Sequence, residues 1–129
     1  MALELKYLAW VTVLTALLWV PYILNMIIVR GIRDAVGYPD NPKPLAPWAQ
    51  RLKAAHYNAI ENLVVFATLV LIAVAAGVHK PAIAGAALVY FWARAAHAVA
   101  YTLAVPWVRT LAFTVGVGCQ LSVAWQILC

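Results

Sequence analysis

Charged residues are scarce in this chain of 129 residues: 10% are Asp, Glu, Lys or Arg, whereas 67% are hydrophobic, and the mean hydropathy is +0.90. A soluble globular domain averages about 25% charged and about 45–50% apolar residues. This composition excludes an ordinary soluble domain, and the length suits a single membrane domain of about four spans. The sequence therefore predicts an all-α, integral membrane four-helix bundle.

Acidic residues are the rarest charged type, with four Asp and Glu against nine Lys and Arg. Most of the basic side chains lie between the first two hydrophobic stretches: Arg30, Arg33, Lys43, Arg51 and Lys53. This is the positive-inside pattern, which predicts that the connection is cytoplasmic and that both termini lie on the opposite side. No soluble surface interleaves basic with aromatic side chains, so we expect no nucleic-acid partner.

Cysteine and histidine are also few. Cys119 and Cys129 are ten positions apart on one predicted helix, about 15 Å along its axis, which is too far for a disulfide. The three histidines have no metal-ligand spacing, and no Ser-His-Asp order or phosphate-binding loop is present. The sequence thus predicts no metal site.

Four long apolar runs predict membrane spans over residues 5–29, 50–78, 82–105 and 108–128. Pro21 removes a backbone donor inside the first span, which predicts a kink near residues 17–21. The chain begins without a basic n-region, so we expect no cleaved signal peptide. Residues 34–49 contain a cluster of prolines with Gly37, and they predict a cytoplasmic loop.

Polar side chains gather at the inner ends of the second and third spans. On the third span, Arg94, His97 and Tyr101 are spaced i, i+3 and i+7, which places them on one face of a helix. Arg94 lies near the middle of the third span. An unpaired arginine near the middle of a membrane span costs at least about 2.5 kcal/mol on insertion scales, so Arg94 needs partners inside the bundle. The full inner set is Arg51, Asn58, Glu61, Arg94, His97, Tyr101 and Arg109.

This inner set holds three arginines and a single carboxylate, Glu61. It predicts a positive cavity for an anionic ligand that carries carboxylates, such as a small peptide. A structural alternative is that Arg94 pairs with Glu61 and locks the second and third spans together.

Near the inner ends of the spans, Arg109 is followed directly by Thr110, which carries a hydroxyl group. An arginine with a hydroxyl donor can stabilise a thiolate. Lowering a thiol pKa from about 8.5 to about 7 requires roughly 2 kcal/mol of preferential thiolate stabilisation. Chemistry on an anionic thiol peptide is therefore a possible function.

Three ordered blocks of the chain share a pattern with known proteins: RLKAAHYNAIENLVVF from Arg51, ARAAHAVAY from Ala93, and PWVRT from Pro106. Together they resemble the MAPEG family, the membrane-associated proteins in eicosanoid and glutathione metabolism. The second block is most similar to the A-R-x-A-H-x-V-A-Y pattern of the microsomal prostaglandin E synthase branch. The family often has a second arginine in the first block, where this chain has Ala54.

The resemblance implies a homotrimer of four-helix protomers that binds glutathione between neighbouring subunits on the cytoplasmic side. It implies thiolate activation by Arg109, with Thr110 at a serine position of the prostaglandin synthase branch. The glutathione contacts that it implies are Arg30, Arg51, Asn58, Glu61, Arg94, His97 and Tyr101.

Three functions remain open from the sequence. The first is a glutathione-dependent transferase, peroxidase or isomerase that acts on a lipophilic electrophile entering from the lipid bilayer. The second is a MAPEG-like scaffold that binds a ligand or partner without catalysis. The third is a small four-helix multidrug-type transporter in which Glu61 handles protons and cations, although the basic residues beside Glu61 disfavour cation transport.

Overall fold

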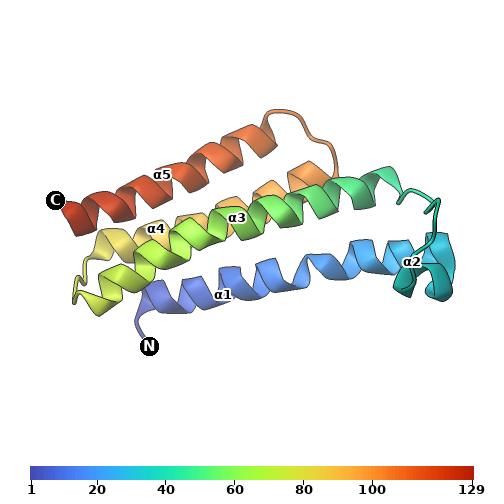
Figure 1. Ribbon diagram of the computed structural model, residues 1–129. Helices are drawn as coiled ribbons and strands as arrows, with labels where there is room; N and C mark the ends of the chain where they lie inside the picture. The colour runs from blue at the N-terminus through green and yellow to red at the C-terminus, as the bar shows by residue number, and fades with distance from the viewer.

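The computed structural model describes residues 1–129 and consists of helices joined by short connections (Figure 1). The helices are α1 (Leu3–Leu17), α2 (Trp19–Val36), α3 (Pro47–Ala75), α4 (Pro81–Thr102) and α5 (Val108–Leu128). The two termini and the α3–α4 turn lie at one end of the bundle, while the α2–α3 loop and the α4–α5 turn lie at the other (Figure 1). We refer to this second end as the loop end.

Four segments are long and apolar enough to cross a membrane: Leu3–Val36, Pro47–Ala75, Pro81–Thr102 and Val108–Leu128. The prediction of an all-helical membrane protein with four spans is confirmed. The first segment has 34 residues, and at about 1.5 Å per residue it is longer than a hydrocarbon core of about 30 Å requires. The end of α2 therefore extends beyond the apolar layer.

The helix bounds differ from the expected ranges at several ends. The segment α2 extends to Val36, past the expected end at residue 29, but Gly31 (φ +80°, ψ 158°) has non-helical dihedrals and divides it at a kink. The helix that begins at Trp19 therefore ends close to the expected residue, and a short separate turn follows it. The connection to α3 accordingly covers residues 37–46 and not 34–49. The third span ends at Thr102, before residue 105, because Ala104 (φ +57°) lies in the left-handed region and turns the chain.

The structure interrupts the first span at the place where the sequence predicts a kink. The helix is interrupted at Leu18, between α1 and α2, where the Leu18 N–H bonds to the Thr15 carbonyl at a long 3.4 Å. Pro21 has no N–H to donate to the Leu17 carbonyl, which is four residues earlier. Proline therefore weakens the helix at this point.

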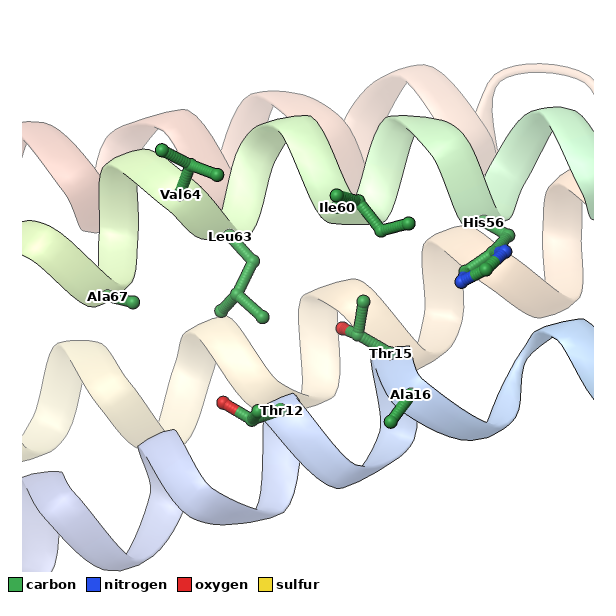
Figure 2. Close-up of a pocket in the computed structure, with 8 residues that line it drawn as sticks. All are labelled: Thr12, Thr15, Ala16, His56, Ile60, Leu63, Val64 and Ala67. Carbon is green, nitrogen blue, oxygen red and sulfur yellow. The ribbon is translucent and has the colours of Figure 1, made fainter.

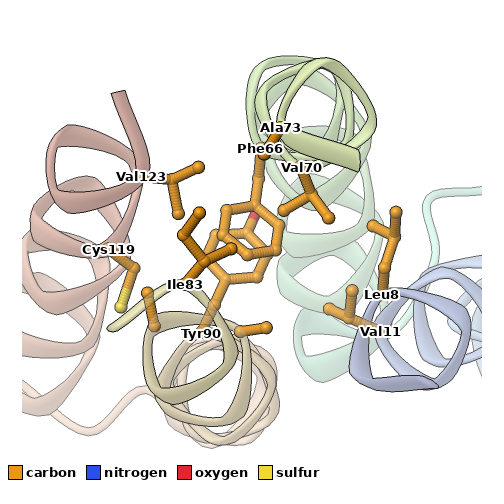
Figure 3. Packing of buried hydrophobic residues seen from close by; sticks show 11 residues of the cluster. Leu8, Val11, Phe66, Val70, Ala73, Ile83, Tyr90, Cys119 and Val123 are labelled. Carbon is orange, nitrogen blue, oxygen red and sulfur yellow. The ribbon is translucent and has the colours of Figure 1, made fainter. Parts of the chain in front are cut away.

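The main core lies around α4, which packs against α1, α3 and α5. At its centre the Phe66 and Tyr90 rings are stacked, with centroids 3.8 Å apart. Cys119 is a free, buried thiol in this core, and Cys129 is free and exposed. The buried side chains, most of which Figure 3 labels, are Leu8, Val11, Phe66, Val70, Ala73, Ile83, Ala86, Ala87, Tyr90, Cys119 and Val123.

A smaller core at the loop end joins α2 to the start of α3, and it consists of Tyr22, Leu45, Ala49 and Leu52. Two polar contacts hold the loop in place. Asn25 Oδ1 accepts the Ala46 N–H at 3.0 Å, and Arg30 Nε donates to the Lys43 carbonyl at 2.7 Å. The loop is thus packed against the helices whose inner ends carry the polar residues.

Candidate anion-binding site

Arg94 is the most deeply placed charged side chain of the molecule, with 3% of its surface exposed. Its Nη2 donates to Asn58 Oδ1 at 2.8 Å and lies 3.4 Å from His97 Nδ1. The Nε and Nη1 atoms are buried and have no hydrogen-bond partner. A buried charged donor without an acceptor is costly, so this guanidinium is suited to an additional anionic or hydrogen-bond-accepting group.

The alternative in which Arg94 pairs with Glu61 is wrong. Glu61 is exposed on α3, and the one ion pair within bonding distance joins His79 and Glu4, at 3.8 Å, at the opposite end of the bundle. Asn58 is the α3 side chain that reaches Arg94, whereas the Glu61 side chain, three residues further along α3, is exposed.

A second cluster lies at the loop end, where α4 ends and α5 begins. The Arg109 guanidinium lies over the Tyr101 ring, with its carbon 4.7 Å from the ring centroid. Arg51 on α3 donates from Nε to the Thr102 carbonyl at 2.9 Å, which brings a second guanidinium to the same place. The side chains of all three residues line a cavity of about 250 Å³ that no acidic residue lines.

His97 connects the two clusters along α4. Its buried ring contacts the Arg94 guanidinium on one side and meets the Tyr101 ring edge-on, with centroids 5.7 Å apart, on the other. Arg94, His97, Tyr101 and Arg109 therefore follow one another in a continuous row, which we call the arginine row. The helical spacing predicted one shared face for the first three members.

Three of the residues named from the sequence lie apart from this row and from Arg51 and Asn58, which are next to it. Arg30 is at the end of α2 and bonds to the loop, Glu61 is exposed on α3, and Thr110 is exposed on α5. Thr110 is exposed beside Arg109, and its backbone carbonyl accepts the Thr114 hydroxyl at 2.9 Å. Within one chain, the fold brings together Arg51, Asn58, Arg94, His97, Tyr101 and Arg109.

Sequence reasoning missed a polar network next to Arg94. The Tyr90 hydroxyl donates to Asn62 Oδ1, and Gln120 Nε2 donates to the same oxygen at 2.8 Å and to the Asn62 backbone carbonyl at 3.1 Å. This network joins α3, α4 and α5 one turn from Arg94. The available signal was Asn62 in an apolar span, with Tyr90 four residues before Arg94 on the same helical face.

No three His, Cys, Asp or Glu side chains are close enough together to hold a metal ion. The donors of the site are guanidinium, amide, imidazole and phenol groups, which suit carboxylates and other anions. The fold and the geometry thus define an integral membrane protein of four spans with a cluster of arginine side chains toward one end.

The MAPEG family model matches residues 7–129, which is nearly the whole chain, and the protein belongs to this family. No curated protein and no solved structure matches the chain. The family resemblance of the three sequence blocks is confirmed, while no relative supports the prostaglandin E synthase branch in particular. Membership indicates a membrane function in glutathione or eicosanoid metabolism.

Proposed function

We propose that this protein is a glutathione-dependent membrane enzyme, a transferase, peroxidase or isomerase that acts on a lipophilic electrophile from the bilayer. The observation that carries the proposal is the arginine row, in which a buried guanidinium keeps two unpaired donors and no carboxylate neutralises the cluster. In a structural ion pair, a carboxylate of the protein would accept hydrogen bonds from Nε and Nη1 of Arg94. We propose that a bound anionic ligand accepts them instead.

Glutathione fits this donor set because it carries two carboxylates, amide groups and a thiol. Arg94 and Asn58 would hold an anionic or amide group at the buried end of the row, with His97 beside them. Arg51 and Tyr101 would hold a second group in the cavity at the loop end. Bidentate guanidinium–carboxylate bonds are among the stronger hydrogen bonds in proteins.

When bound, glutathione supplies a thiol nucleophile. We assign the stabilisation of its thiolate to Arg109, whose guanidinium is held against the Tyr101 ring and lines the cavity. Thr110 follows it with an exposed hydroxyl that could donate a second hydrogen bond. Stabilising a thiolate by roughly 2 kcal/mol lowers a thiol pKa from about 8.5 to about 7.

A homotrimer is part of the proposal, because it accounts for Glu61 and Arg30. Glu61 is an exposed carboxylate on a membrane span, which is costly against lipid unless another chain covers it. In an assembly, Glu61 and Arg30 of one chain could face a glutathione molecule bound at the arginine row of its neighbour, where Glu61 would hold the ammonium group and Arg30 a carboxylate. The basic loop end would lie in the cytoplasm, as the positive-inside pattern predicts.

The proposal is tested with purified protein in detergent, by calorimetry with glutathione and by conjugation of glutathione to an aromatic halide. At pH 7 we expect Arg109→Ala to lower the conjugation rate by about 15-fold, because a thiol pKa that rises from about 7 to about 8.5 lowers the ionised fraction from about one half to about 3%. Glutathione affinity should change much less. Raising the pH should restore part of the rate, because the free thiol then ionises without help. Arg33→Ala is the matched control, since Arg33 is an exposed arginine at the same end and outside the row.

An absence of glutathione binding to the wild-type protein would refute the enzyme proposal. Binding with an unchanged rate in Arg109→Ala would remove only the thiolate assignment. Binding without turnover of any electrophile would indicate the non-catalytic scaffold. Proton-coupled uptake of a lipophilic cation into vesicles would indicate the multidrug-type transporter.

A further inference from the structure

The cavity beside Arg109 has an irregular wall. The groove between α1 and α3 is bounded by regular helix on both sides (Figure 2), whereas three of the seven residues that line the Arg109 cavity belong to the turn between α4 and α5: Ala104, Val105 and Pro106. This turn lies at the loop end (Figure 1). It also contains the two residues other than glycine with positive φ, Ala104 (φ +57°) and Trp107 (φ +69°). Left-handed dihedrals are costly for a residue with a Cβ, so the turn holds backbone strain beside the cavity.

The positive φ of Ala104 has a structural explanation. The Val105 N–H donates to the Ala100 carbonyl at 2.9 Å, and the Ala104 N–H donates to the Tyr101 carbonyl at 3.2 Å. These two bonds form a Schellman motif, a common helix ending that places a left-handed residue at the position of Ala104. Ala104 therefore terminates α4, and its conformation needs no further role.

The positive φ of Trp107 is not explained in this way. With φ +69° and ψ −44°, and with the Val108 N–H donating to the Pro106 carbonyl at 2.8 Å, Trp107 is the centre of a γ-turn of the rare, strained kind. Its side chain does not hold this conformation, because 77% of its surface is exposed and no side chain caps α5. Strained backbone residues cluster at functional sites, where the strain serves the geometry of a nearby group.

The γ-turn decides where α5 begins. The Trp107 carbonyl accepts the Leu111 N–H at 2.8 Å, which is the first hydrogen bond of α5, and Arg109 lies within this first helical turn. From there the Arg109 guanidinium reaches over the Tyr101 ring beside the cavity. With an ordinary negative φ at residue 107, the γ-turn bond would be lost and α5 would leave the turn in another direction. Arg109 would then move relative to Tyr101 and the cavity.

We propose that Trp107 is a positioning residue, whose left-handed backbone conformation, and not its indole ring, holds the Arg109 guanidinium over Tyr101. The part that concerns the thiolate rests on the proposed function, whereas the position of the guanidinium can be measured without glutathione. Substitutions of Trp107 should then rank by their tolerance of positive φ: glycine best, then asparagine, then alanine, with the β-branched valine last. A tryptophan that served only as an anchor in the membrane interface would give a ranking by hydrophobicity instead.

Hydrogen exchange on the full chain in lipid nanodiscs measures how often the turn opens. In Trp107→Gly, the amides of residues 108–111 should exchange about tenfold more slowly than in Trp107→Ala, because a positive φ is accessible to glycine and costs other residues a factor of about ten. Trp107→Asn should fall between these two variants, and Trp107→Val should exchange faster than Trp107→Ala. The rates are compared as protection factors, which remove differences in intrinsic exchange.

Two measurements report on Arg109 itself. Modification of its guanidinium by phenylglyoxal, located by peptide mass spectrometry without glutathione, should be slowest in Trp107→Gly and fastest in Trp107→Val. In the conjugation assay, Trp107→Gly should keep the wild-type rate although it lacks the indole. Trp107→Val should lower kcat about fivefold, which is part of the loss expected for Arg109→Ala, with a smaller change in KM. These differences should disappear in Arg109→Ala protein, where no guanidinium is left to position.

Trp125 provides a matched control, because it is an exposed tryptophan within the regular part of the same helix. Glycine is a poorer helix former than alanine, so Trp125→Gly should speed the exchange of neighbouring amides relative to Trp125→Ala. This order is the opposite of the one expected at Trp107. Neither variant of Trp125 should change the modification of Arg109.

A ranking by hydrophobicity, with fastest exchange and modification in Trp107→Gly and Trp107→Asn, would overturn the proposal. Equal rates in all variants of Trp107 would also overturn it, as would differences in conjugation rate that persist in Arg109→Ala protein. If the wild-type protein binds no glutathione, the proposed function fails, and the orders of exchange and modification still decide the role of Trp107. If Trp107→Gly does not fold, Trp107→Asn decides the question against Trp107→Val.

Discussion

At the scale of single residues, Arg94 sets the chemistry of the inner end. Its Nη2 has an acceptor in Asn58, but two further donors of the same guanidinium are buried without one. Breaking or omitting the partner of a buried charge is strongly destabilising, whereas replacing the charge by an apolar group of similar volume is often neutral or stabilising. The native side chain is therefore retained at an energetic cost, which points to a binding role.

Arg94→Met tests this interpretation. We expect the free energy of unfolding in detergent to stay unchanged or to rise by about 1–2 kcal/mol, because a buried charge with unpaired donors is removed. Glutathione affinity measured by calorimetry should fall at least about tenfold, since a charge-assisted hydrogen bond contributes about 1.5–3 kcal/mol. Arg33→Met, at an exposed position, should change neither quantity.

A loss of more than about 2 kcal/mol of stability in Arg94→Met, with affinity retained, would instead make Arg94 a structural residue of the α3–α4 contact.

At the scale of elements, α4 carries most of the candidate site, and α2 of the first span holds the loop that leads into α3. The first three members of the arginine row follow one face of α4, and its fourth member, Arg109, lies on α5. Arg51 of α3 lines the same cavity as Arg109 at the loop end. The start of α3 is held to α2 through Asn25, whose Oδ1 accepts the N–H of Ala46, the residue just before α3. This bond closes the loop of residues 37–46 against the bundle.

Asn25→Ala should loosen this loop. Loss of one partly buried hydrogen bond of about 1 kcal/mol raises the population of open loop about fivefold, and limited proteolysis within residues 37–46 should accelerate to the same extent. Asn25→Asp is the matched control, because its carboxylate can still accept the Ala46 N–H, and its cleavage rate should remain near that of the wild type. Equal cleavage rates in all three proteins would show that the contact does not restrain the loop.

At the scale of the whole molecule, charge and topology agree. The chain carries a net charge of +5, and the loop end holds the basic loop, Arg51 and Arg109, while both termini lie at the other end (Figure 1). Basic residues near short loops set the orientation of membrane spans. The loop end is therefore expected in the cytoplasm, with the arginine row accessible from that side.

Cysteine labelling tests this orientation with an internal control, since Cys129 is a free, exposed thiol at the C-terminus. In Lys43→Cys protein, a membrane-impermeant maleimide should label the introduced thiol only in inside-out vesicles and Cys129 only in right-side-out vesicles. Labelling of both positions from one side would contradict a four-span topology. The reverse assignment would place the arginine row outside the cytoplasm.

The sequence by itself determined the features that depend on one helix at a time. The hydropathy of the chain defines four spans because each must satisfy its own backbone hydrogen bonds in lipid. Pro21 determines the interruption at Leu18 because the missing N–H acts on its own helix. The shared face of Arg94, His97 and Tyr101 follows from helical periodicity alone.

The tertiary structure decided which residues meet across helices. Arg94 contacts Asn58 and not Glu61, and Gln120 reaches Asn62 across 58 positions of sequence. Arg51 and Arg109 likewise line one cavity at the end of α4 only because α3 and α5 pack there against α4. These contacts depend on the rotation and axial offset between packed helices, which side-chain interdigitation sets and which no single helix encodes.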